Sequence, residues 1–311
     1  MKATNSTSLF ALNRDVRMIW VGILYFAISI FIPPLFYVIM KIIYKQDKTT
    51  PNFTYKLMNF ILLLQLLQGI CHFITSPILV FPALLTEFEV IVRILGCMAN
   101  TSWIGELPMM ALLAICRVLI FANSMEIRIT PLVVKMIVVC IVCWVLFVFI
   151  AGCITQNLMF SPPSWGYDFS VPYAELFDML EIFLTVPCLA ISYFAYLTII
   201  FLICSKRNRN GSNQSRKNEI RILIQSTFVT TYMACLVVVW HPVIFTMVSF
   251  IDMTKFRNIA IANGFWILHS YCHPIIILIF HKTIRIDCLL KLKLRYNSST
   301  QQRVWKPPRS S

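Results

Sequence analysis

Three potential metal ligands lie close together near the C-terminus of the chain. The stretch HSYCHPIIILIFHKTIR, residues 269–285, begins with His269, Cys272 and His273 within little more than one helical turn. Zinc binds imidazole and thiolate groups, but a site needs three or four ligands that converge. His241 offers a further imidazole, although no sequence pattern links it to this stretch. Because the surrounding residues are apolar, we interpret the histidines as facing the interior of a helix bundle, and we expect no metal and no other cofactor.

One acidic residue lies deep inside an apolar segment. Glu106, in WIGELPMMALLAICR, precedes Arg117 by eleven residues, which is about 16 Å along a helix. A charged acid at the centre of a membrane helix costs roughly 2.5–3.5 kcal/mol, so Glu106 must be neutral or have a polar partner. Gln65 is the expected partner. The pair has either a purely structural role or the role of a buried polar switch that rearranges on activation. A proton or ion pathway would need several such acids in series.

The composition indicates that most of the chain does not face water. Of its 311 residues, 59% are hydrophobic and 13% are charged, whereas a soluble domain carries about 25% charged residues. The net charge of +14 would suggest nucleic-acid binding in a soluble protein. In an apolar chain it is better explained by cytoplasmic loops beside anionic lipid. We therefore expect a multi-pass protein of the lipid bilayer with no nucleic-acid partner and no catalytic residues.

Seven apolar segments are long enough to cross the hydrocarbon as helices, which takes about 20 residues each. We predict spans at residues 18–40, 57–80, 93–122, 132–154, 179–204, 222–250 and 259–280. The predicted fold is an all-α, rhodopsin-like bundle of seven transmembrane helices. It divides the chain into an extracellular N-terminus (1–17), a seven-helix domain (18–280) and a cytoplasmic tail (281–311).

Basic residues orient the predicted bundle in the plasma membrane. With an extracellular N-terminus, 21 of the 27 lysines and arginines lie on the cytoplasmic side, as the positive-inside rule requires. Most acidic residues then lie outside, and Glu181 is counted among them. This orientation leaves Asn5, in Asn5-Ser6-Thr7, as the one usable glycosylation site, because the other sequons would be cytoplasmic or within a helix.

Two prolines in the sixth and seventh spans are expected to act as helix pivots. Proline inside a helix removes a backbone donor and favours a bend. Trp240 and Pro242 form a Trp-x-Pro sequence that resembles the pivot of rhodopsin-like receptors, and Pro274 lies correspondingly in the seventh span. Simple packing is the alternative for both. Arg117, which closes the third span, is either an interfacial arginine or the arginine that contacts a G protein.

Three segments at characteristic spacing resemble the nematode serpentine chemoreceptors of class T, a divergent branch of rhodopsin-like receptors. They are YKLMNFILLLQLLQ (55–68), WIGELPMMALLAICR (103–117) and FWILHSYCHPIIILIFHKTIR (265–285). The family residues fall on Tyr55, Lys56, Met58, Trp103, Glu106, Arg117, Trp266, His269, Pro274, Thr283, Ile284 and Arg285. The resemblance covers nearly the whole chain.

Membership of this family would imply a chemosensory receptor that binds a small molecule or odorant and signals through a heterotrimeric G protein. Arg117 and Arg221 would then lie on the G-protein side, and location in sensory-neuron cilia would follow. Departures from the family pattern, such as Cys116 before the arginine and His281 before KTIR, weaken the expectation of G-protein coupling. The alternative class is a transporter or channel, against which we find no internal repeat.

The outer loop and the tail carry three further expectations. The second outer loop, FSPPSWGYDFSVPYAELFDM, either covers a ligand pocket between the third, fifth, sixth and seventh helices or is a plain solvated loop. It contains no cysteine, so we predict no disulfide to the third span; a bridge between Cys97 and Cys153, near the outer ends of their helices, is the alternative. Residues 282–295 are expected to form a short amphipathic helix on the membrane, with Cys288 as a palmitoylation site.

Overall fold

The computed structural model describes residues 8–49, 51, 53–122, 131–205, 213–241, 252, 254–280 and 285. Within these ranges, the side chains of residues 213–223, 225, 226 and 280 are not described. The predicted glycosylation site Asn5, the pivot Pro242, the tail helix and Cys288 lie outside the described residues. Arg221 is placed only as part of a helix backbone.

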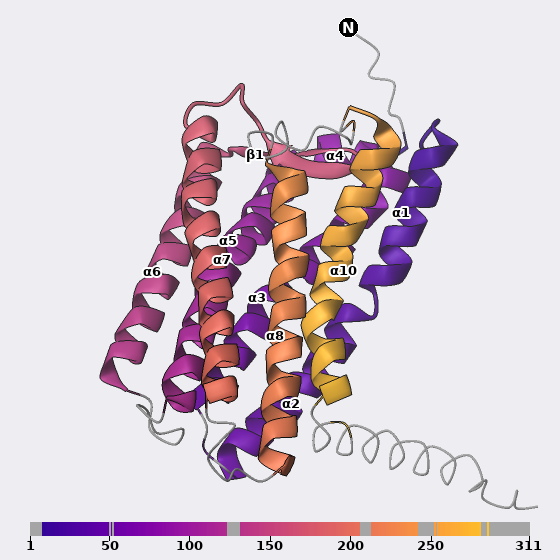
Figure 1. Ribbon diagram of the computed structural model, residues 1–311. Coiled ribbons are helices and arrows are strands. Elements are labelled where there is room, and N and C mark those ends of the chain that lie inside the picture. Colours follow the sequence, from indigo (N-terminus) through magenta and orange to yellow (C-terminus); the bar gives the residue numbers. More distant parts are fainter. Residues whose placement is uncertain are drawn as a thin grey trace, which may run out of the picture.

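The described chain is a bundle of long helices with one small hairpin (Figure 1). The helices are α1 (Val16–Ser29), α2 (Ile32–Thr49), α3 (Phe53–Val80), the short α4 (Ala83–Glu87), α5 (Glu89–Phe121), α6 (Leu132–Thr155), α7 (Ala174–Ser205), α8 (Asn213–Trp240) and α10 (Phe256–Phe280). Counting α1 and α2 as one, six of these are long and apolar enough to cross a membrane, and α8 adds a shorter apolar segment, Thr227–Trp240. Helices suit this environment because every backbone group is paired within the segment. The chain is an all-helical membrane protein, as its composition predicts.

The first predicted span is wrong in detail, because it consists of two helices. Asp15 caps α1 by accepting a hydrogen bond from the Arg17 backbone N–H at 2.9 Å. The helix ends at Ser29, and α2 begins at Ile32 with prolines in its first turn. Proline is tolerated there because the first N–H groups of a helix have no partner within it. The second helix then continues to Thr49, well beyond the predicted end at residue 40.

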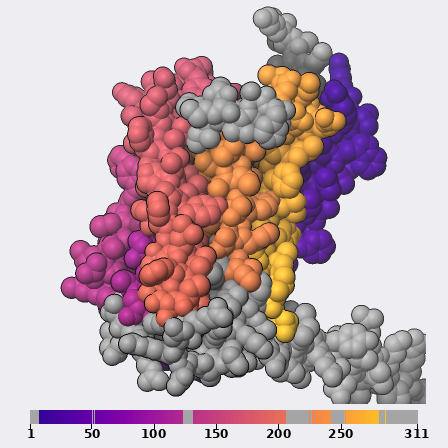
Figure 2. Space-filling model, viewed as in Figure 1, coloured from indigo at the N-terminus to yellow at the C-terminus, as the bar shows by residue number. Residues whose placement is uncertain are grey.

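The helix α5 forms the centre of the bundle. It packs against α3, α6 and α7, and it has the largest buried share of any span, whereas α6 has the smallest and faces outward. Gly105 allows the close approach of α6, because a Cβ atom there would lie 2.5 Å from Val145 Cγ2. Figure 2 shows α7, α8, α10 and α1 side by side along one face of the molecule.

A two-stranded hairpin lies across one end of the bundle, which we call the hairpin end (Figure 1). Strand β1 (Leu158–Ser161) pairs antiparallel with β2 (Ser164–Tyr167), with Leu158 opposite Tyr167. The two strands lie in the predicted second outer loop, for which the sequence indicated no strands. The hairpin end is also where α1, α5, α7 and α10 begin, so it corresponds to the predicted extracellular face.

Two contacts fix the hairpin to α5. The buried indole of Trp165 lies against Gly96, where a Cβ atom would come within 2.4 Å of the ring. Arg93 Nη1 donates to the Gln156 carbonyl at 2.9 Å and to Asp168 Oδ2 at 3.0 Å. Hydrogen bonds from Ser170, with the Arg93 pair, hold the pKa of Asp168 below its ordinary value. Of the two expectations for this loop, a covering role agrees with its position.

Candidate functional site

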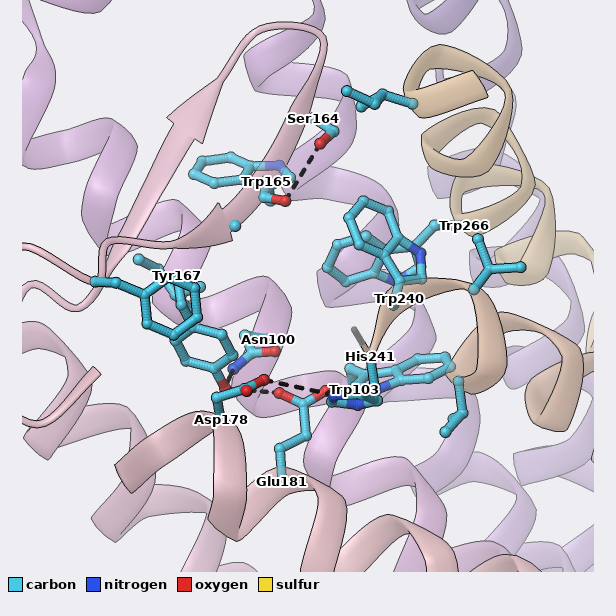
Figure 3. Close-up of a pocket in the computed structure, with 16 residues that line it drawn as sticks. Asn100, Trp103, Ser164, Trp165, Tyr167, Asp178, Glu181, Trp240, His241 and Trp266 are labelled. Atoms are coloured by element: carbon cyan, nitrogen blue, oxygen red, sulfur yellow. Dashed lines mark hydrogen bonds and ion pairs between the residues drawn. The ribbon is translucent and has the colours of Figure 1, made fainter. Parts of the chain in front are cut away.

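A cavity of about 340 Å³ lies beneath the hairpin. We call it the hairpin cavity (Figure 3). Its described lining comes from α5, the hairpin, α7, the end of α8 and α10: Asn100, Trp103, Leu158, Ser164, Trp165, Gly166, Tyr167, Phe169, Asp178, Glu181, Val237, Val239, Trp240, His241, Ile259 and Trp266. These helices are the third, fifth, sixth and seventh spans, between which the sequence predicted a ligand pocket. The volume lies at the small end of the range of about 300–1,000 Å³ for ligand pockets.

Aromatic rings form most of the wall. The rings of Trp103, Trp240 and Trp266 meet edge to face, with centroids 6.2 Å apart for Trp103–Trp266 and 5.4 Å for Trp240–Trp266. Trp165 and Tyr167 enter from the hairpin (Figure 3). Trp240 was predicted as a helix pivot, and the structure places it at the last residue of α8, against the cavity.

Two carboxylates and one imidazole lie together on the other side of the cavity (Figure 3). Asp178 Oδ1 is 3.5 Å from His241 Nδ1, and Glu181 Oε1 is 3.4 Å from His241 Nε2. The acids are one turn apart on α7, which begins at Ala174 rather than at the predicted residue 179. Glu181, which was counted from the sequence among the acids of the outer side, lies within α7 near its start and is buried, with 6% of its surface exposed.

The hairpin completes this acidic group. The Tyr167 hydroxyl donates to Glu181 Oε2 at 2.6 Å, and Asn100 Nδ2 donates to the same hydroxyl oxygen at 2.8 Å. Burial raises the pKa of Tyr167 well above its ordinary value, so the hydroxyl keeps its proton and remains a donor. One signal for this group was present in the sequence: the i, i+3 spacing of Asp178 and Glu181, which places both on one face of a helix.

A second polar group lies deeper, where the sequence predicted a buried acid with one partner. Glu106 Oε1 accepts from Gln65 Nε2 at 2.6 Å and lies 3.0 Å from His269 Nε2. Glu106 Oε2 accepts from Gln68 Nε2 at 3.0 Å. Gln65 Nε2 is also 2.9 Å from His273 Nδ1. We call these five residues the buried network.

The structure brings the predicted pair Gln65 and Glu106 together and adds partners that the sequence analysis missed. Gln65, Gln68, Glu106 and His269 are fully buried. The available signal was the spacing of His269 and His273, one turn apart on the same helix. Among the described residues, no group of three or more histidine, cysteine or acidic side chains could hold a metal ion.

Trp266 connects the hairpin cavity with the buried network. Its ring lines the cavity, and its Nε1–H donates to Gln68 Oε1 at 3.0 Å. Trp103 also lies between the two, with its ring centroid 6.2 Å from that of Trp266 and 5.5 Å from that of His269. A molecule in the cavity would therefore touch rings that contact the network directly.

Arg117 lies in the opposite half of the bundle. It is buried, with 9% of its surface exposed, and lines a small cavity with Met58, Tyr196 and His273. His273 thus stands between the buried network and Arg117. The other predicted pivot, Pro274, is the next residue and lies inside α10. The predicted roles of Arg117, Pro274 and Trp240 remain predictions.

A membrane bundle with a cavity at one end and a buried polar network below it is the architecture of a seven-transmembrane receptor. The family model described as serpentine type 7TM GPCR chemoreceptor Srt matches residues 6–301. The chain belongs to this family, and the family predicted from the three sequence segments is confirmed. Its members are receptors and not enzymes, so the prediction of a non-catalytic chain is also confirmed. No individual curated protein matches the chain significantly.

Proposed function

We propose that the chain is a chemosensory receptor of the plasma membrane that binds a small molecule in the hairpin cavity and signals through a heterotrimeric G protein. The observation that carries this proposal is the contact of Trp266 with both the cavity and Gln68. It gives a ligand a direct physical route to the buried network. Family membership supports the same function.

Activation is proposed as a shift between two states of the bundle. A ligand shifts such an equilibrium only if it binds one state more tightly. Contact with Trp240 and Trp266 would favour one arrangement of the ends of α8 and α10. Movement at Trp240–Pro242 and at Pro274 would then open a basic cleft for the G protein, with Arg117 and Arg221 on the cytoplasmic side. Location in sensory-neuron cilia is part of this proposal and rests on the family alone.

A transporter or channel is the rival function. It would need a chain of polar groups across the bilayer. In the described bundle, the contacts from the cavity of Glu181 to the network of Glu106 run through the indole rings of Trp266 and Trp103 rather than through a series of acids. This arrangement favours the receptor.

The test compares signalling with flux in one cell line. Cells express the receptor with a G protein that couples to calcium release, and basal and chemically evoked calcium signals are measured at equal surface level. We expect the wild type to signal and Arg117→Ala to lose the signal without losing surface expression. Arg257→Ala, which removes an exposed arginine from the first turn of α10, serves as the matched control for the loss of an arginine. Ion flux without any G-protein signal would support the rival.

A further inference from the structure

We propose that the hairpin cavity selects small organic cations, such as protonated amines or quaternary ammonium ions that also carry an apolar group. The inference rests on the proposed function, because it names the chemical class of the ligand of that same cavity. It is carried by two features of the described lining, an excess of carboxylates and a wall of aromatic rings.

The carboxylates outnumber the groups that could neutralise them. Asp178 and Glu181 both face the single imidazole of His241, which carries at most one positive charge. No lysine or arginine occurs among the described residues that line the cavity. Arg93, at the same end of the bundle, is paired with Glu89 and Asp168 at 3.0 Å each. With both acids ionised, the cavity has a net negative charge whichever form His241 takes.

Each oxygen of Glu181 faces a polar group of another element. Its Oε2 accepts from the Tyr167 hydroxyl, which itself accepts from Asn100 and so has its proton directed at the carboxylate. Its Oε1 faces His241 Nε2. The Tyr167 hydroxyl therefore meets an accepting carboxylate oxygen, and the imidazole of His241 is the one other polar partner that the described contacts give to Glu181.

The aromatic wall suits the same ligand. A cation near the face of an indole ring is attracted by about 0.5–2 kcal/mol, depending on how far it is desolvated. Trp103, Trp165, Trp240 and Trp266 all line the cavity, as do the two carboxylates (Figure 3). An anion would be repelled by the carboxylates and by the negative ring faces, whereas an uncharged ligand would gain contact with the rings but no charge attraction. Cation binding uses both features together.

A cysteine in the cavity tests the charge without knowledge of the ligand. Gly166 lines the cavity, and a Cβ atom there meets nothing within 4 Å, so Gly166→Cys should fold. The purified variant is treated with two methanethiosulfonates of equal length, one ending in trimethylammonium and one in sulfonate. Labelling of the parent chain gives the background from native cysteines. We expect the ratio of cation to anion rates to exceed that of a free small thiol by about tenfold or more.

Two neutralising variants locate the source of this preference. Asp178→Asn and Glu181→Gln, each added to Gly166→Cys, should lower the rate ratio by about tenfold. Glu175→Gln is the matched control, because Glu175 lies on the same helix but is exposed and outside the cavity lining. Thermal unfolding of each variant shows whether it is folded. A ratio equal to that of the free thiol, or one that neither neutralisation lowers, would overturn the proposal.

A set of matched molecules then tests binding itself. We would use 2-phenylethylamine, 2-phenylethanol and phenylacetate, which share a ring and differ in charge. The amine should raise the unfolding temperature of the purified receptor, and Asp178→Asn should abolish that rise. Equal or larger effects of the alcohol or the acid, or no effect of the amine, would count against the proposal. None of these measurements uses a G protein, so they succeed or fail independently of the signalling assay.

Discussion

At Glu106, hydrogen-bond donors from two other helices meet one carboxylate. Gln68 cannot turn its amide round without losing its bond from Trp266, so its Nε2 must face Glu106 Oε2. That oxygen therefore acts as an acceptor. Gln65 is under no such constraint, because its Oε1 has no other partner among the described residues. The two glutamines thus have different freedom, although the sequence presents them as equivalent.

This difference predicts how Glu106 responds to substitution. Glu106→Gln keeps an acceptor for Gln68, and Gln65 can turn its amide to accept from the new NH₂ group. We expect near-normal folding and surface level with altered basal signalling, since the partner of His269 loses its charge. Glu106→Leu leaves the donors unpaired. Interhelical hydrogen bonds in membranes average about 0.6 kcal/mol each, so the stability loss should be small.

The measurement for Glu106 is basal and evoked signalling at matched surface level, alongside thermal unfolding of purified protein. A change of 1.4 kcal/mol in the free-energy difference between the two receptor states would change their ratio about tenfold. If wild type, Glu106→Gln and Glu106→Leu signal equally, the buried network is structural only.

Trp266 provides a second prediction at the level of one hydrogen bond. Trp266→Phe keeps an aromatic ring in the cavity wall but removes the Nε1–H that binds Gln68. If this hydrogen bond stabilises one receptor state by about 0.6 kcal/mol, its removal changes the ratio of inactive to active receptor about threefold. We expect basal signalling to change by that factor. Trp20→Phe is the control, because Trp20 is 68% exposed on α1. An identical response of the two variants would show that the bond carries no signal.

One of the two contacts that fix the hairpin to α5 is the close approach of Trp165 to Gly96. A methyl group at Gly96 would lie 2.4 Å from the rigid ring of Trp165, so Gly96→Ala must displace the hairpin. We expect a lower unfolding temperature and faster labelling of a cysteine at position 166 in this variant. Gly264→Ala is the matched control, because its new methyl group would meet only Tyr25 Cε1, at an ordinary contact distance of 3.7 Å. Equal stability of the two variants would mean that the ring moves aside without cost.

The bounds of a helix could be predicted from the sequence where a long apolar run alone determines them. Long apolar runs gave the spans of α3, α5, α6 and α10 to within a few residues of the observed ends. The break between α1 and α2 was missed, because two adjacent prolines at residues 33 and 34 were read as part of one apolar run. The hairpin was missed because its short strands are held by Arg93 and Gly96, contacts with a distant segment that local sequence does not encode.

In the candidate site too, single residues could be predicted from the sequence, whereas contacts between distant segments could not. Glu106 and Gln65 were found from the cost of a buried acid, which is a property of single residues in a span. The contact of His241 with Glu181 needed the ends of α7 and α8 to meet under the hairpin. The count of charges along the sequence assigned Glu181 to the outer side of the membrane but did not predict that it is buried against His241.

For the whole molecule, the described chain enters and leaves the bundle at opposite ends, as a chain that crosses the membrane an odd number of times must. The described chain starts α1 at the hairpin end, and α10 finishes at the opposite end (Figure 1). The two ends of the bundle also differ in charge. The described acids of the hairpin cavity lie at one end, whereas most of the basic residues of the sequence belong to loops and a tail that follow the other ends of the helices. Such a field would draw cations to the cavity.

This charge difference yields the last prediction, the orientation in the membrane. An extracellular hairpin end places the sequon at Asn5 outside, and it places those at Asn52, Asn210, Asn213 and Asn297 inside, away from the glycosylation machinery. Treatment of the wild type with an endoglycosidase should therefore increase its gel mobility. Asn5→Gln should show no change on treatment, and Asn213→Gln, the matched control, should behave as the wild type does. A glycan that survives in Asn5→Gln and disappears in Asn213→Gln would reverse the orientation. The hairpin cavity would then face the cytoplasm and could not receive an external ligand.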